Sequence, residues 1–128
     1  MTSRERVRKA VNHQKTDRIP LDMGSTLVTG IQASTYAKLR KVLGLKDEPA
    51  RIIDPFQMLA EVDTEVREKL GVDTIGLWLP TNVFGFKNEN WKPWKLFDGT
   101  EVVVPERFIT TTDDKGNIYI YPQGDTSA

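Results

Sequence analysis

Residues 17–24 read Asp17-Arg18-Ile19-Pro20-Leu21-Asp22-Met23-Gly24. The proline is typical of the start of a strand, and apolar residues follow it at alternate positions. The stretch ends in Asp22, Gly24 and Ser25, which suit a polar loop and a close approach of the backbone. We therefore predict a strand at residues 17–24, followed by a loop that carries a site, as at the start of a β/α enzyme.

Helical patterns flank this stretch on both sides. Thr2, followed three residues later by an acid, has the capping-box pattern and predicts a helix to about Gln14. Apolar residues at helical spacing predict a second helix around Tyr36, which stops at Gly44. A third helix is predicted from Asp54, as its N-terminal cap, to Gly71.

Extended segments complete an α/β pattern. Residues 51–53 form a short extended piece, and the continuously apolar run 74–79 suits a strand covered on both faces of a mostly parallel sheet. Beyond residue 80, Asp98-Gly99 predicts a tight hairpin, and a second hairpin joins 109–112 to 118–121. The last residues, 122–128, read as the middle of a loop.

Composition excludes several classes of protein. The 128 residues are 38% hydrophobic and 28% charged, a normal balance for one globular domain. The 18 basic and 18 acidic residues cancel, which argues against a nucleic-acid partner. No apolar run is long enough for a membrane span or a signal peptide, so we expect a cytoplasmic protein without a membrane partner. There is no cysteine and one histidine, so no metal site is expected within these residues.

Three segments, 17–24, 54–59 and 88–94, together resemble the N-terminal part of the uroporphyrinogen decarboxylase family. They look closest to its branch of corrinoid-linked methyltransferases. The resemblance implies the incomplete N-terminal part of a TIM (β/α)₈ barrel, with the first β/α units in residues 1–79 and an inserted β-hairpin region, cut at its end, in residues 80–128. A complete barrel needs at least ~200 residues, so the remainder of the barrel would be missing and the chain alone inactive. The length also permits a free-standing small α+β domain.

One family motif distinguishes two activities. True uroporphyrinogen decarboxylases carry Arg-Gln-Ala-Gly-Arg after the first strand, and its arginines bind the carboxylates of the tetrapyrrole. Laid over this chain without gaps, the motif falls on residues 25–29, where Ser25 and Thr29 replace the two arginines. Neutral hydroxyls do not replace paired charge-assisted hydrogen bonds, so the methyltransferase branch is favoured over porphyrinogen decarboxylation.

The predicted site lies at the carboxyl end of the first strand, where barrel active sites are built. Asp22 is the candidate catalytic carboxylate, although an Asp before Gly is also a common turn residue. The candidate substrate-binding residues are Gly24, Ser25, Thr26 and Trp78. The expected function is methyl transfer between a corrinoid and an acceptor; a decarboxylase of porphyrin biosynthesis and a small non-catalytic binding module are the alternatives. The resemblance also implies a small-molecule substrate, a corrinoid protein as partner, and zinc held by residues outside this chain.

Overall fold

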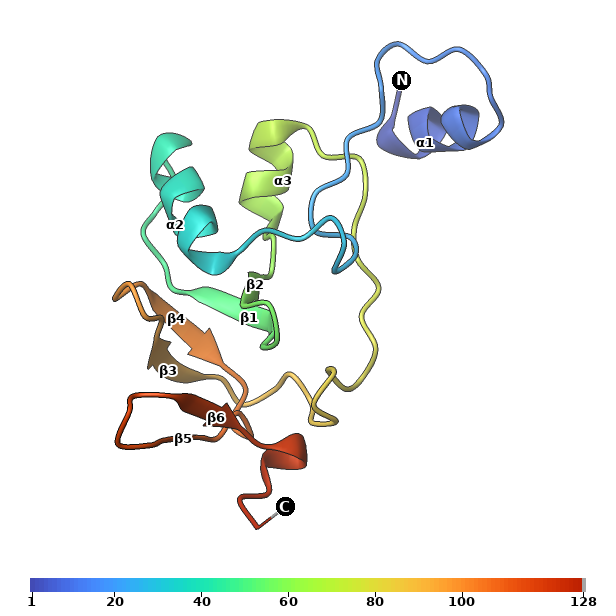
Figure 1. Ribbon diagram of the computed structural model, residues 1–128. Coiled ribbons are helices and arrows are strands. Elements are labelled where there is room, and N and C mark those ends of the chain that lie inside the picture. Colours follow the sequence, from blue (N-terminus) through green and yellow to red (C-terminus); the bar gives the residue numbers. More distant parts are fainter. Residues whose placement is uncertain (128) are drawn as a thin grey trace.

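The computed structural model describes residues 1–127, a mixed α/β fold with two small open sheets and three α-helices (Figure 1). The helices are α1 (Ser3–Val11), α2 (Ala33–Val42) and α3 (Thr64–Leu70). The strands are β1 (Ala50–Asp54), β2 (Leu59–Ala60), β3 (Lys92–Lys95), β4 (Glu101–Val104), β5 (Thr110–Thr112) and β6 (Ile118–Ile120), and Pro122–Gly124 forms a 3₁₀ turn. Ala128, the end of the predicted C-terminal loop, lies outside the described residues.

The larger sheet has the strand order β2-β1-β4-β3. β1 pairs with β4 in parallel, with Ala50 opposite Val102, and antiparallel neighbours flank this central pair on both sides. The sheet therefore joins a strand from residues 1–79 to a hairpin from residues 80–128. β5 and β6 form a separate antiparallel ribbon.

The core lies between this sheet and the two helices α2 and α3, which stand beside each other over β1 and β2 in Figure 1. Ile52 and Val104 from the central strands, Tyr36 from α2 and Val66 from α3 are almost fully buried. Burying an aliphatic or aromatic side chain of this size stabilises the fold by about 1.5–3 kcal/mol. These contacts hold the end of β1 in place beside the candidate site.

Short-range sequence signals are confirmed at several elements. The hydroxyl of Thr2 accepts from the N–H of Glu5 at 3.2 Å, and the Glu5 carboxylate accepts from the N–H of Thr2 at 2.8 Å. Gly44 follows α2 with a φ of +69°, as the predicted stop requires. Both predicted hairpins form, as β3–β4 and β5–β6, with Gly99 and Gly116 at positive φ in their turns.

The predicted helix from Asp54 is wrong in its first half. The Asp54 carboxylate accepts from the N–H groups of Phe56 and Gln57, and the chain reverses through Met58, whose φ is +54°. β2 then pairs antiparallel with β1, and α3 begins only after Asp63, whose carboxylate caps it. This reversal lets β2 pair with β1 and buries both residues of β2.

The two predicted barrel strands are also not formed as strands. Residues 17–24 and 74–79 are irregular, and one backbone hydrogen bond joins their borders, from the N–H of Asp73 to the carbonyl of Leu21 at 2.8 Å. A strand in a parallel sheet needs hydrogen-bonding neighbours along its length. Leu77 is 95% exposed, so the apolar run lacks the cover that its composition predicts.

A network of charges attaches α1, which lies apart from the helix-sheet core in Figure 1. Arg6 on α1 binds Asp17 at 2.7 Å and Asp73 at 2.5 Å, and Arg18 binds Asp73 at 2.7 Å. Burial of Asp73 favours its neutral form, but hydrogen bonds from Leu21 and the two arginines outweigh burial and hold the pKa of Asp73 well below its usual range. The same carboxylate therefore fixes both α1 and the start of the candidate site.

Candidate functional site

The loop after residue 21 is organised around Asp22. Its carboxylate oxygen Oδ1 accepts from the N–H of Ser25 at 3.3 Å and from the hydroxyl of Thr74 at 2.6 Å. Thr26 and Thr29 bond each other through their hydroxyls at 3.1 Å, which closes the loop. The loop is thereby tied to the segment that precedes Trp78.

The electrostatics of Asp22 suit positioning better than proton abstraction. Burial raises the pKa of Asp22, but hydrogen bonds from Ser25 and Thr74 outweigh burial and leave the pKa below its ordinary value. A carboxylate with a low pKa is a weak base near neutral pH, where a general base works best with a pKa close to the operating pH. An ionised Asp22 can instead orient the Ser25 loop.

Two glycines allow the backbone segments to meet. A Cβ on Gly24, whose φ is +78°, would lie 2.5 Å from Cγ2 of the buried Val62. A Cβ on Gly76 would lie 2.8 Å from the Trp78 ring and 3.0 Å from the carbonyl of Ser25. Gly24, predicted to bind substrate, therefore serves as a contact of the loop with the core. Gly76 was not predicted, although a glycine inside an apolar run is a signal of close approach.

Beside the loop lies a hollow of about 460 Å³. It brings together Ser25, Thr26 and Trp78, three of the predicted substrate-binding residues, whereas Asp22 and Gly24 are not among its lining residues. The rest of the lining consists of Leu27, Ile53, Asp54, Leu77, Leu79, Thr81, Asn82, Val83 and Asn88. This volume is in the range of small-molecule sites.

Asp54 and Asn88 complete the wall and were not predicted as site residues. Asp54 is 2% exposed at the end of β1. Asn88 donates to the carbonyl of Ile53 at 2.9 Å and accepts from Asn82 at 2.9 Å, so its amide is held in one orientation. A carboxylate at a strand end was the available signal for Asp54, but the sequence pattern favoured a helix cap.

The hollow has an unbalanced charge. Asp54 is its one ionisable lining residue, and no lysine or arginine lines it. Within residues 1–127 the Asp54 carboxylate takes part in no ion pair and accepts from backbone N–H groups alone. The same residues contain no group of three histidines, cysteines or acids that could hold a metal ion.

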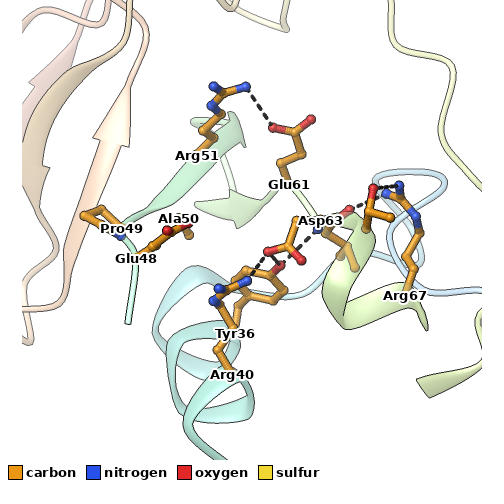
Figure 2. Close-up of a pocket in the computed structure, with 11 residues that line it drawn as sticks. Tyr36, Arg40, Glu48, Pro49, Ala50, Arg51, Glu61, Asp63 and Arg67 are labelled. Carbon is orange, nitrogen blue, oxygen red and sulfur yellow. Dashed lines mark hydrogen bonds and ion pairs between the residues drawn. The ribbon is translucent and has the colours of Figure 1, made fainter. Parts of the chain in front are cut away.

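A second hollow, of about 320 Å³, lies between α2, β1 and α3 (Figure 2). Here Tyr36 donates to Asp63 at 2.6 Å, and the buried Arg40 forms an ion pair with the same carboxylate. Burial raises the pKa of Tyr36 to about 12, so its phenol stays protonated at neutral pH. These groups satisfy one another and join α2 to the cap of α3, which is a structural role.

Comparison of the chain with protein families, with curated proteins and with solved structures finds no match. In the part of the chain that the structure describes, no helix has both the length and the apolar character needed to cross a membrane.

Proposed function

We propose that this chain is the N-terminal part of an enzyme of the uroporphyrinogen decarboxylase type, in which the hollow beside the loop after Asp22 binds the acceptor of a methyl group. A corrinoid, carried by a partner protein, supplies the methyl group in this proposal. The supporting observation is that Trp78 lines one hollow of about 460 Å³ together with Ser25 and Thr26, which are distant from it in sequence.

The proposed fold is a partial (β/α)₈ barrel. The proposed location of the protein is the cytoplasm. The support for this fold is the hydrogen bond between Asp73 and Leu21 together with the bond between Thr74 and Asp22, which set residues 17–24 and 74–79 side by side. In the proposal, these two segments become adjacent parallel strands when further strands pair with them. The described residues offer no zinc site, so no step of the reaction is assigned to a metal here.

The side chains of the hollow and its loop have different roles in substrate binding. Trp78 presents an apolar face to the acceptor, and the hydroxyl-bearing residues Ser25 and Thr26 provide polar contacts. Asp22, ionised and hydrogen-bonded to the loop, is the positioning residue. Correct positioning of reacting groups supplies several kcal/mol of a reaction barrier, about 7–11 in good intramolecular systems.

The decarboxylase alternative has weaker support. A tetrapyrrole with several carboxylates needs cationic partners, but no arginine or lysine lines this hollow and Asp54 would repel the substrate. A small binding module is the other alternative. It accounts for the hollow without chemistry, and it predicts binding with no turnover.

Product analysis tests the proposal. Because the chain alone is expected to be inactive, the full-length enzyme that contains it is incubated with methylcobalamin and a thiol acceptor, and separately with uroporphyrinogen. We expect a methylated thiol and no loss of carboxyl groups. Stepwise decarboxylation would restore the first alternative, and the absence of both reactions would favour the binding module.

Asp22→Asn gives a sharper test of the same proposal. It keeps the size of the side chain and removes its charge, so methyl transfer should fall by about tenfold to a hundredfold as the loop loses its orientation. The free energy of unfolding should change by about 1 kcal/mol or less. Asp47→Asn, at an exposed position outside the site, is the matched control and should leave transfer unchanged. Equal activities of the two variants would contradict the role given to Asp22.

A further inference from the structure

Asp54 carries a buried carboxylate at the end of β1. Charged groups are costly to bury unless a counter-charge or several hydrogen bonds compensate them. Asp54 accepts from the N–H of Phe56 at 3.3 Å and from the N–H of Gln57 at 3.2 Å, both long hydrogen bonds. Each carboxylate oxygen has two acceptor positions, so two long hydrogen bonds compensate this buried group only in part.

The walls of the hollow suit a cation with an apolar surface. Leu27, Leu77 and Val83 supply aliphatic contact, and Trp78 supplies an indole ring. The face of an indole ring attracts organic cations, and quaternary ammonium groups are recognised in this way. Because no lysine or arginine lines the hollow, nothing there repels a positive ligand.

The side-chain amides next to Asp54 are held in fixed orientations. Asn88 is fixed by its bonds to Ile53 and Asn82, and Asn82 also accepts from the N–H of Phe84 at 3.0 Å. These polar groups line the hollow together with Asp54. A ligand with a cationic head and a short polar tail can therefore satisfy both the acidic and the amide part of the wall.

From these contacts we propose that the hollow is a binding site for a small alkylated ammonium compound, with its charge next to Asp54 and its alkyl groups against Trp78. This inference deepens the proposed function, on which it rests for the view that the hollow is a substrate site: the hollow recognises the ammonium group, and the atom that accepts a methyl group lies elsewhere on the ligand, because a quaternary nitrogen has no free lone pair. It names a substrate class and assigns no chemical step.

Matched ligands separate charge from shape. Choline and 3,3-dimethyl-1-butanol have nearly the same size, and only choline carries a positive charge. An NMR titration of the chain with each compound reports both affinity and location. We expect choline to bind about tenfold tighter or more, with the largest shifts at residues 25–27, 53–54 and 77–83. Equal binding of the two compounds, no binding, or shifts elsewhere would overturn the inference.

Two variants test the contacts. Asp54→Asn removes the charge and keeps one of the two acceptor oxygens of the turn, so it should abolish the preference for choline. Because this residue is buried, a second variant is needed in case Asp54→Asn does not fold. Trp78→Leu should weaken choline at least about fivefold and leave 3,3-dimethyl-1-butanol almost unchanged. Trp91→Phe, outside this hollow, is the matched control.

The choline titration and the methyl-transfer assay can give different results. Choline preference without transfer would support the ligand class and contradict the enzyme. Transfer to a thiol without choline preference would support the enzyme and overturn the ligand class.

Discussion

Gly24→Ala should destabilise the chain, and the free-energy cost has two parts. The first part is conformational, because φ at Gly24 is +78° and a left-handed residue with a Cβ costs about 1–2 kcal/mol. The second part is steric, because the new Cβ would lie 2.5 Å from Cγ2 of Val62. Overpacking of this kind costs about 1–3 kcal/mol, so the total is about 2–5 kcal/mol.

Gly44→Ala isolates the conformational part. Gly44 has a φ of +69°, and a Cβ there would meet nothing within 4 Å. Its replacement should therefore cost about 1–2 kcal/mol. Urea unfolding followed by tryptophan fluorescence gives both free energies on the same scale.

Val62→Ala tests the steric part, because it removes Cγ2. Alone it should cost about 1–3 kcal/mol through the lost burial. Combined with Gly24→Ala, it should relieve the collision, so that the double variant is more stable than the sum of the single effects predicts by about 1 kcal/mol or more. Additive effects, or a Gly24→Ala cost equal to that of Gly44→Ala, would refute the close approach of the Asp22 loop to the core.

Two further predictions concern titrating groups. Tyr36→Phe should cost about 1–2 kcal/mol of unfolding free energy, because the N–H of Asp63 loses its acceptor. Burial raises the pKa of Tyr36 from 10.0 to about 12, so the stability difference between the native chain and this variant is fully present below pH 10 and is lost as the pH rises to 12. Urea unfolding across that pH range measures this difference. Asp73 has a lowered pKa, so its contribution is present above its ordinary value of 3.8 and is lost as the pH falls below it. Asp73→Asn should therefore flatten the acid limb of the stability profile, and an unchanged acid limb would contradict the network around Arg6.

Short-range chemistry was predictable from the sequence. The cap at Thr2, the stop at Gly44 and the turn at Asp98-Gly99 each depend on a few neighbouring residues, and all three are present. The start of the third helix was predicted wrongly because Asp54 and Asp63 are both residues of the type that caps helices, whereas its end at Gly71 was predicted correctly. Only the pairing of β2 with β1, decided by burial in three dimensions, selects between these two residues.

Long-range pairing was not predictable in the same way. β1 and β4 are distant in sequence, and no local pattern indicates that they are parallel neighbours. The apolar run 74–79 can form a strand only if neighbouring strands pair with it. In the part of the chain that the structure describes, no strand pairs with this run along its length. The candidate site was predicted in part, because Ser25, Thr26 and Trp78 meet, whereas the contribution of Asp54 depends on how the chain turns after β1.

The attachment of α1 has a consequence for cooperativity. In the part of the chain that the structure describes, the ion pairs that hold this helix to other segments are made by one arginine, Arg6, and α1 shares no part of the main apolar cluster. It can therefore detach as a separate folding unit, and its amide hydrogens should exchange earlier than those of β1 and β4. All three tryptophans lie at positions 78, 91 and 94, outside α1, so a single fluorescence transition would report the sheet and its helices while this early step passes unseen.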